Sequence, residues 1–153
     1  MITKLIFSEN GKFIVRAFRN GDEFQILELF QQVFGKEKTL KHWIWEFKLN
    51  PYGTQIMLGF HFNKLVAQCA AIPVMLYAEG RLLKGAQLVD CMSHPRYRAI
   101  AVRKKGIFAI TVQSFFDEFT GKGKDAYLFG FPSYRHYRLG KLLLGYRKVR
   151  PIS

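Results

Sequence analysis

The feature that most constrains the fold of this chain is a change of hydrophobic period between residues 87 and 119. Residues 87–92 read as an apolar strand, and a basic loop at residues 94–106 follows it. From Gly106 onward, apolar side chains recur mostly every three or four residues, which predicts a helix at residues 107–120. A strand that leads through a basic turn into a helix start outlines a phosphate cradle, because the first amides of a helix lack internal partners and carry the positive end of its dipole.

The preceding part of the chain predicts a hairpin, two helices and three antiparallel strands. The dipeptide Asn10-Gly11 between two apolar runs is a strong hairpin signal. One helix is expected to be capped by Asp22 and to end at Gly35. A second is expected to begin after Thr39 and to stop at Asn50-Pro51. The period then changes to that of strands, which are predicted at residues 55–62, 64–77 and 82–92.

Beyond the helix that follows the basic loop, the chain returns to the sheet. Residues 126–131 predict a short buried strand, parallel to the strand that contains Val89 because a helix separates the two. A last helix is expected at residues 133–145 and the start of another strand at residues 146–152. The whole chain is expected to be one α+β domain with a mixed, mostly antiparallel twisted sheet flanked by four helices. The apolar side of the last helix is expected to comprise Leu139, Leu142 and Leu143.

The positive charge of the chain is concentrated in its second half. Residues 1–80 contain 9 Lys and Arg against 7 Asp and Glu, whereas residues 81–153 contain 15 against 4, and the net charge is +13. The basic field therefore belongs to the half that carries the loop. It predicts an anionic partner, such as a nucleotide-like cofactor, nucleic acid or an acidic surface. The alternative is a basic surface that serves only solubility.

Several other classes of protein fit the sequence poorly. Hydrophobic residues make up 49% and aromatic residues 16% of the chain, a composition that excludes a disordered protein. No apolar run approaches the roughly 20 residues of a membrane span, and the N-terminus lacks the apolar core of a signal peptide. Cys69 and Cys91 each lie in an apolar strand, which favours two buried free thiols in a cytoplasmic protein, and no cysteine or histidine spacing suggests zinc.

Three segments, in the expected order along the chain, resemble the GNAT superfamily of N-acetyltransferases. The first is residues 19–23, with the sequence Arg-Asn-Gly-Asp-Glu, which leads into the first helix. The second is residues 90–108, which resembles the acetyl-CoA pyrophosphate loop and matches the first two fixed positions of the pattern Gln/Arg-x-x-Gly-x-Gly/Ala. The third combines residues 130–133 with residues 142–146. The resemblance implies the GNAT fold, with a C-terminal hairpin that is incomplete in this chain.

The resemblance also implies acetyl-CoA as cofactor and an amine as acceptor. The charges of the basic loop and the amides at the start of the following helix would bind the phosphates. The backbone of the preceding strand would bind the thioester arm of the cofactor in the way that it would bind a neighbouring strand. An amide of Met92 or Ser93 would face the oxyanion that develops during the reaction. The cofactor-binding residues implied in this way are Cys91, Met92, Ser93, Arg98, Arg103, Lys104, Lys105, Gly106, Ile107 and Phe108.

Acetyl transfer to an amine also needs a base. An alkylamine with a pKa near 10.4 is almost fully protonated at pH 7, a deficit of roughly 4.6 kcal/mol. Asp90, an acid in an otherwise apolar strand, is the best candidate, and His94 is the second. The alternative for Asp90 is a structural acid paired with a nearby arginine, and the alternative for His94 is a loop residue that simply precedes a proline.

The chain departs from the family pattern at several places. Phe108 stands where the loop pattern has glycine or alanine, and the loop before it is longer than the compact form. Where many GNAT enzymes place a tyrosine near the leaving thiol, the last helix aligns Gly140, with Tyr137 and Tyr146 nearby. Only the start of the C-terminal hairpin is present. The chain is therefore expected either to be the N-terminal part of a longer protein or to be completed by another strand, from its own N-terminal hairpin or from a second copy in a homodimer.

Three functions follow as alternatives. The first is an acetyl-CoA-dependent N-acetyltransferase that acts on a primary amine. The second is a catalytically degenerate CoA-binding module on the same fold. The third is a nucleic-acid-binding protein that uses the basic half, where tyrosines and arginines interleave at residues 134–138 in a way that suits base stacking. The sequence favours the first.

Overall fold

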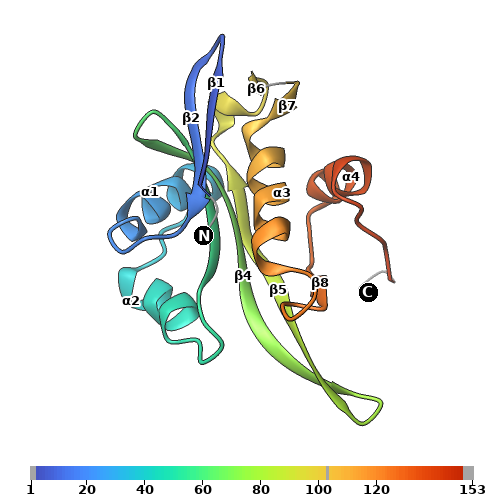
Figure 1. The fold of residues 1–153 in the computed structure, drawn as a ribbon. Coiled ribbons are helices and arrows are strands. Elements are labelled where there is room, and N and C mark those ends of the chain that lie inside the picture. The colour runs from blue at the N-terminus through green and yellow to red at the C-terminus, as the bar shows by residue number, and fades with distance from the viewer. Residues whose placement is uncertain (1–2, 103, 150–153) are drawn as a thin grey trace.

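The computed structural model of the protein describes residues 3–102 and 104–149, and it contains a six-stranded sheet with helices on both faces (Figure 1). The strand order is β1-β2-β3-β4-β5-β8, and every neighbouring pair is antiparallel except β5 and β8, which run parallel. The predicted mixed, mostly antiparallel sheet is therefore confirmed. The strands of this sheet are β1 (Thr3–Ser8), β2 (Gly11–Ala17), β3 (Gln55–His61), β4 (Lys64–Ala78), β5 (Arg81–Ser93) and β8 (Tyr127–Phe129).

The helices lie on opposite faces of this sheet. Figure 1 shows α1 (Glu23–Phe34) and α2 (Leu40–Trp43) to the left of the sheet and α3 (Ile107–Phe119) to its right, with α4 (Tyr134–Leu143) farther out. α2 continues directly as a π-helical turn at Ile44–Lys48. The long basic loop before α3 contains a small antiparallel hairpin, β6 (Ala101–Val102) and β7 (Lys105–Gly106).

Two apolar cores result, one on each face of the sheet. Because both faces are covered, the central strands β3 and β4 are buried along most of their length rather than on alternate residues. Burial of one large apolar side chain is worth roughly 1.5–3 kcal/mol, so the apolar contacts of α1 and α3 with the sheet contribute much to holding these two helices in place. The core under α1 and α2 includes Ile26, Leu29, Trp43, Phe47, Ile56, Leu58 and Met92. The core under α3 includes Phe13, Val15, Met57, Cys69, Ile107, Val112 and Phe115.

The turns between strands follow local sequence signals. The hairpin predicted at Asn10-Gly11 is confirmed, because Ser8 pairs with Gly11 across it. The β4–β5 turn consists of Glu79-Gly80, both with positive φ (+49° and +75°), as a tight two-residue hairpin turn requires. α1 ends at Gly35 with φ +65°, the left-handed conformation that glycine adopts without strain, so the predicted helix end is also confirmed.

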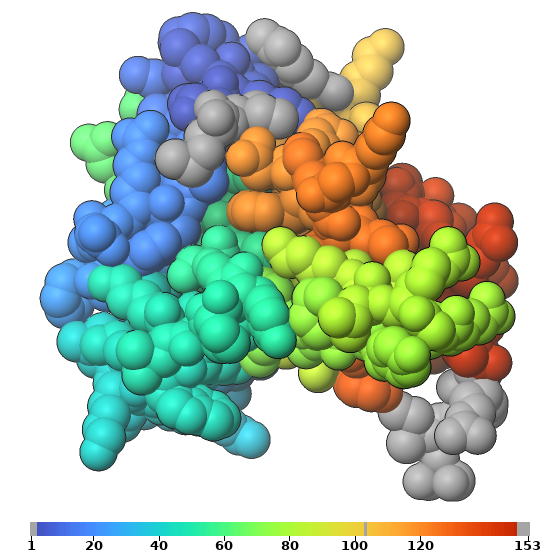
Figure 2. All heavy atoms as spheres, turned by 60° about the horizontal axis from the view of Figure 1, so that its bottom comes forward, coloured from blue at the N-terminus to red at the C-terminus, as the bar shows by residue number. Residues whose placement is uncertain are grey.

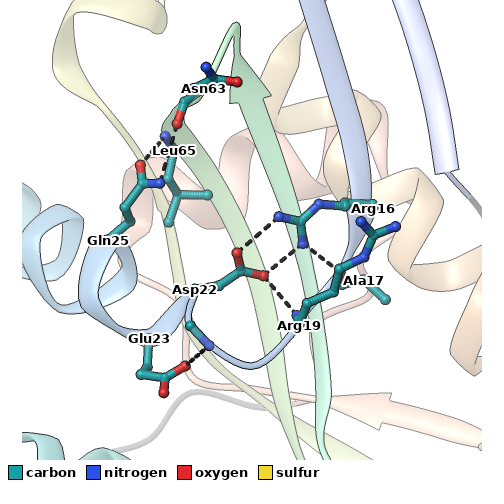
Figure 3. Close-up of polar contacts among 9 residues, drawn as sticks. Arg16, Ala17, Arg19, Asp22, Glu23, Gln25, Asn63 and Leu65 are labelled. Atoms are coloured by element: carbon teal, nitrogen blue, oxygen red, sulfur yellow. Dashed lines mark hydrogen bonds and ion pairs between the residues drawn. The ribbon is translucent and has the colours of Figure 1, made fainter.

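The start of α1 is tied to β2 and to the β3–β4 turn (Figure 3). Arg16 of β2 donates two hydrogen bonds to the Asp22 carboxylate, at 2.7 and 2.9 Å, and the amide of Arg19 donates a third at 2.7 Å. The sequence predicts that Asp22 caps the helix with its side chain. Instead the carboxylate faces the preceding turn and makes no capping bond to α1, because Arg16 and the Arg19 amide already occupy it. Gln25 then bonds backbone atoms of the β3–β4 turn and of β4.

Three expectations for the C-terminal part of the chain are wrong. Residues 144–149 form no strand, so the strand predicted at residues 146–152 is absent as far as the structure describes it; residues 150–152 lie outside that part. The leucines of α4 expected to pack inward are exposed, and β8 is half-buried rather than buried. The physical reason is that β8 is the edge strand and that no element among the described residues covers this side of α4.

The far end of the β4–β5 hairpin extends beyond the rest of the sheet. Figure 2 shows this end, in yellow-green, forming part of the surface that faces the viewer. Leu76, Tyr77 and Leu82 are exposed there. No helix in the residues that the structure describes has the length and apolar character needed to cross a bilayer.

Candidate active site

β5 and β8 pair over three residues and then separate. Residues 85–87 pair with residues 127–129. Just beyond, Gly130 still lies close to β5, because a Cβ atom added to it would be 3.4 Å from Leu88. β5 continues to Ser93, whereas the chain after β8 turns away towards α4. Among the described residues, Val89–Ser93 has no strand partner on this side, so the sheet offers an open strand edge in its interior.

A β-bulge lies in this open part of β5. The register with β4 shifts between Gln68 and Ala70, so that Cys69 alone faces two residues of β5, Asp90 and Cys91. Asp90 has φ +48°, in the left-handed region that aspartate and asparagine tolerate better than other residues with side chains. The side chains of the two bulge residues reach opposite sides. Asp90 contacts the α1–α2 connection, whereas Cys91 packs with the core under α3, with its sulfur 3.8 Å from that of Cys69 and both thiols free.

The carboxylate of Asp90 is paired with a lysine rather than with the arginine that the sequence suggests. Lys38, from the connection between α1 and α2, places its ammonium against Asp90 and 2.5 Å from Oε2 of Glu46. The same nitrogen lies 4.6 Å from the centroid of the Phe30 ring and 5.6 Å from that of Phe47. The side chains of Lys38, Glu46 and Asp90 are only 8%, 12% and 17% exposed, so their charges interact with little screening by water.

His94 is less well placed to act as a base. Its side chain is buried, and Nδ1 accepts a hydrogen bond from the amide of Arg96 at 3.2 Å. Burial lowers the pKa of His94, and the charges of Lys64, Arg96 and Arg98 lower it further. The neutral ring therefore carries its proton on Nε2 and has no acceptor nitrogen left for a substrate. Its own amide bonds the carbonyl of Val66 at 2.8 Å, which fixes the end of β5.

The start of α3 has the features of the predicted phosphate cradle. Gly106 precedes the helix and offers no side chain to cap it. In the part of the chain that the structure describes, no acceptor occupies the amides of residues 107–109. Lys104 and Lys105 are exposed beside them. A cavity of about 170 Å³ separates this helix start from the end of α4, and it is lined by Lys104, Lys105, Gly106, Ala109, Gln113, Leu143 and Leu144.

The remaining residues predicted in the loop lie in different surroundings. The guanidinium of Arg98 donates hydrogen bonds of 3.1 and 3.3 Å to the carbonyl of Ser93, so it holds the loop against the end of β5. Arg103 lies outside the described residues. Phe108 is half-buried and meets the ring of His136 edge-on, with 5.7 Å between the centroids, so this side chain fills space between α3 and α4.

Tyr146 lies beside the glycine at which the resemblance expects a tyrosine. The chain turns back after α4, the ring of Tyr146 packs on Gly140, and its hydroxyl lies 3.3 Å from Nε2 of His136. Burial raises the pKa of Tyr146, and the neighbouring thiols of Cys91 and Cys69 raise it further. The phenol is therefore protonated at neutral pH, and it lies near the bulge of β5.

The structure brings most of the predicted site residues into two groups. Asp90 and residues 91–93 all lie in the open part of β5, and residues 104–108 gather at the start of α3. His94 lies at the end of β5 with its ring already bonded. A wider hollow of about 600 Å³, between α1 and the β3–β4 turn, contains none of the predicted site residues.

The sequence pattern does not single out Lys38 or Glu46. Lys38 belongs to the charged connection at residues 36–38, of a kind that is usually solvated, and Glu46 is one charge on an amphipathic helix. Only the fold brings them to Asp90. A weak signal did exist for Tyr146, because Gly140 interrupts a leucine-rich helix, and a glycine there marks the close approach of another group.

Comparisons with known proteins agree with this architecture. The sequence matches the model of the acetyltransferase (GNAT) domain over residues 14–139. The fold is similar to that of glucosamine-6-phosphate N-acetyltransferase from Arabidopsis thaliana, with a TM-score of 0.71 and 15% identity over 92% of this chain and 96% of that one. It is also similar to an aminoglycoside 6'-N-acetyltransferase from Acinetobacter baumannii, with a TM-score of 0.68 and 12% identity over 92% and 95% of the two chains.

A third similar structure is a probable N-acyltransferase from Enterococcus faecalis V583, with a TM-score of 0.61 and 20% identity. The match covers 83% of this chain but only 31% of that much longer one. A comparison with curated protein sequences gives no match. At these identities the structural likeness establishes the fold, and the domain model, which matches most of the sequence, establishes the family. The chain belongs to the GNAT family of acetyltransferase domains.

Proposed function

We propose that this chain is an acetyl-CoA-dependent N-acetyltransferase whose acceptor is a primary amine. The observation that carries the proposal is the bulge in the open part of β5, from which Asp90 reaches the side of α1 and α2 and Cys91 the side of α3. An extended arm with amide groups can add to an open strand edge. An amine at Asp90 would lie next to such an arm, so donor and acceptor would approach the same strand from different sides.

The start of α3 supports acetyl-CoA as the donor. The amides of residues 107–109 and the positive end of the helix dipole favour a pyrophosphate, and Lys104 and Lys105 add full charges beside them. Each charge contact is worth about 1 kcal/mol in open water and several times more where water is excluded. When bound, acetyl-CoA supplies the activated acetyl group. We assign residues 104–109 to holding its phosphates and residues 91–93 to aligning its arm.

Asp90 is the base in this proposal. Its carboxylate already contacts an ammonium, that of Lys38, so it can accept the proton of an acceptor amine in the same geometry. A general base typically raises a rate by about 10²–10⁴, equivalent to roughly 3–5 kcal/mol, which matches the cost of deprotonating an alkylamine at pH 7. The ring of His94 has no free acceptor nitrogen, so we assign it to holding the end of β5.

Tyr146 is the proposed proton donor to the leaving thiolate. Its hydroxyl lies in a partly buried position near Cys91, and its raised pKa keeps the proton on the oxygen. It comes from the segment after α4 rather than from the helix position at which the resemblance expects a tyrosine. His136, at 3.3 Å, orients the hydroxyl.

Calorimetry with acetyl-CoA, followed by mass spectrometry of a panel of primary amines incubated with the protein and acetyl-CoA, tests the proposal. We expect saturable binding and an acetylated amine, with a rate that falls by about 10²–10⁴ in the Asp90→Asn variant. Asparagine also tolerates the left-handed φ of position 90, so the bulge is retained. A protein that does not bind acetyl-CoA at millimolar concentration would refute the proposal. Binding without any acetylated product would support the catalytically degenerate module instead.

A further inference from the structure

The ammonium of Lys38 lies in surroundings that suit a substrate amine. Two carboxylates, those of Asp90 and Glu46, and two aromatic rings, those of Phe30 and Phe47, surround it. Carboxylates and aromatic faces are the groups by which proteins bind alkylammonium ions. The chain therefore contains a formed site for a primary ammonium, and its own lysine fills that site.

Stability alone explains this arrangement poorly. Removing charged groups from water is costly, and a buried ion pair often stabilises a protein no better than apolar packing of the same volume. Here one ammonium faces two carboxylates, which leaves an excess of negative charge. The only other basic side chain within 4 Å of Glu46, among the residues that the structure describes, is that of His42, at 3.9 Å and 54% exposed. The two carboxylates thus favour a bound cation, but the single positive charge of Lys38 does not neutralise both of them.

The position of the pocket connects it with the reaction. One of its two carboxylates belongs to the bulge of β5, next to the residues that face the open strand edge. The lysine that fills it comes from the connection between α1 and α2, at residues 35–39, which forms neither helix nor strand. Withdrawal of this one side chain would leave an ammonium-shaped vacancy at the proposed base.

We propose that the pocket formed by Asp90, Glu46, Phe30 and Phe47 is the acceptor-ammonium subsite, and that Lys38 is an internal occupant that an acceptor must displace. This inference rests on the proposed function, in which Asp90 is the base. The acceptor class is a primary alkylammonium, because the pocket offers carboxylate oxygens to its N–H groups and aromatic faces to its positive charge. An acceptor can bind only while Lys38 is out of the pocket. The apparent Kd for acceptors therefore equals the intrinsic Kd divided by the fraction of molecules in which the pocket is free.

A binding experiment without acetyl-CoA tests the subsite. The Lys38→Ala variant lacks the ammonium that normally fills the pocket. The ion n-butylammonium has the four-carbon chain and ammonium of a lysine side chain, so it should bind the empty pocket and raise the melting temperature of the variant in a dose-dependent way. The wild type and a Lys36→Ala variant, which changes an exposed lysine of the same connection, should show no such rise. The neutral analogue n-butanol should have no effect on any of them. Absence of the rise in Lys38→Ala, or an equal rise in the wild type, would overturn the proposal.

A kinetic experiment tests whether the subsite serves the acceptor. With saturating acetyl-CoA, we expect KM for n-butylamine to be about tenfold or more lower in Lys38→Ala than in the wild type, since the internal competitor is gone. Lys36→Ala should keep the wild-type KM. Adding Glu46→Gln to Lys38→Ala should raise KM again by about fivefold, because a charged acceptor of the ammonium is lost. Equal KM values in the wild type and Lys38→Ala would overturn the acceptor role.

The same samples separate a failure of this inference from a failure of the proposed function. If Lys38→Ala does not fold, the Lys38→Ala, Glu46→Gln double variant replaces it in the melting experiment, because the carboxylate of Asp90 is left for one ammonium. In the kinetic experiment the two changes oppose each other, so the double variant should show a KM about twofold or more below that of the wild type, and an equal KM would overturn the acceptor role. A protein that binds acetyl-CoA by calorimetry and acetylates n-butylamine, but with KM unaffected by Lys38, refutes only the role of Lys38. A protein that binds no acetyl-CoA refutes the proposed function and the acceptor role with it.

Discussion

The ring of Tyr146 lies so close to Gly140 that a Cβ atom added to Gly140 would come within 2.2 Å of Cδ2 of the ring. Glycine inside a helix costs about 1 kcal/mol relative to alanine, so α4 is weakened at the point where the ring docks. Any side chain at position 140 would push the ring aside. This contact fixes a tyrosine from beyond the helix next to the bulge of β5, where the proposed chemistry takes place.

Removal of the Tyr146 hydroxyl should slow the reaction without changing donor affinity. Tyr146→Phe keeps the ring on Gly140 but cannot protonate a thiolate, so we expect kcat to fall by roughly 10²-fold, at the low end for a positioned acid. Gly140→Ala should lower kcat to a similar extent, because it displaces the ring. Steady-state kinetics and calorimetry with acetyl-CoA measure the two effects. Full activity of Tyr146→Phe would mean that solvent protonates the thiolate.

The same tyrosine sets an expectation for the dependence on pH. Burial raises the pKa of Tyr146 above its ordinary value near 10, and the donor role requires the protonated form. Ionisation of Tyr146 should therefore cause no loss of kcat up to about pH 10. A decline of kcat with a midpoint well below pH 10 that is present in the wild type and missing in Tyr146→Phe would contradict this expectation.

Neutralising the lysines at the start of α3 should weaken acetyl-CoA binding. We expect Lys104→Gln and Lys105→Gln each to raise Kd about fivefold at low ionic strength, equivalent to about 1 kcal/mol, and less in high salt, where exposed charges are screened. Lys122→Gln, in the exposed turn after α3, carries the same charge change away from the cavity. If all three variants lose affinity equally, the basic field acts as a whole and the lysines beside the cavity have no special role.

Gly59 of β3 lies directly beneath α3, and a side chain there should destabilise the fold. A Cβ atom on Gly59 would be 2.5 Å from Oγ1 of Thr111 and 3.1 Å from Ile107. Overpacking of this kind typically costs about 1–3 kcal/mol, so urea unfolding of Gly59→Ala should show a loss of that size. Combining it with Thr111→Ala should cost less than the sum of the two single changes. Strict additivity would show that the contact with Thr111 is not the source of the loss.

The ion pair at the start of α1 should make stability depend on acid. Burial alone would raise the pKa of Asp22, but the hydrogen bonds from Arg16 and from the amide of Arg19, with the charges of both arginines, outweigh it and hold the pKa below its ordinary value. A carboxyl group with a lower pKa in the folded state adds stability that is present above about pH 4 and is lost as pH falls through the folded pKa.

Urea unfolding at a series of pH values measures this contribution. Below about pH 4 the wild type should lose stability more steeply than Asp22→Asn, which has no carboxyl to protonate. Parallel losses in the two proteins would assign the acid sensitivity to other carboxylates.

Local sequence signals predicted much of the fold. Gly11 (φ +111°) and Gly35 (φ +65°) have positive φ, which few residues other than glycine adopt, so together with Asn10 they marked a hairpin and a helix end correctly. The change of hydrophobic period placed a helix at residues 107–120, and the structure has it at Ile107–Phe119. The helix start with exposed Lys104 and Lys105 could be predicted for the same reason, since it consists of consecutive residues, whereas its role in binding phosphate stays a prediction.

The polar partners of the site could not be predicted, because they depend on contacts between distant elements. Asp90 was open to interpretation as a base or as a paired acid, and its partner Lys38 is 52 residues away in a connection without any pattern of its own. The bulge arises from the register between β4 and β5, which an apolar run does not encode. The prediction that the leucines of α4 pack inward was wrong, because an apolar stripe on a helix does not specify whether another element covers it.

Within the part of the chain that the structure describes, the end of β5 has no strand partner on one side, and this should let an inhibitor bind that copies neither acetyl-CoA nor an amine. Residues 89–93 offer a free strand edge although β5 is not the outermost strand of the sheet. A short peptidomimetic with an extended backbone would pair with these residues as an added strand and block the opening between β5 and β8. Its affinity would come from main-chain hydrogen bonds, so it would need no phosphate mimic. Groups directed towards Asp90 and Cys91 would give it selectivity.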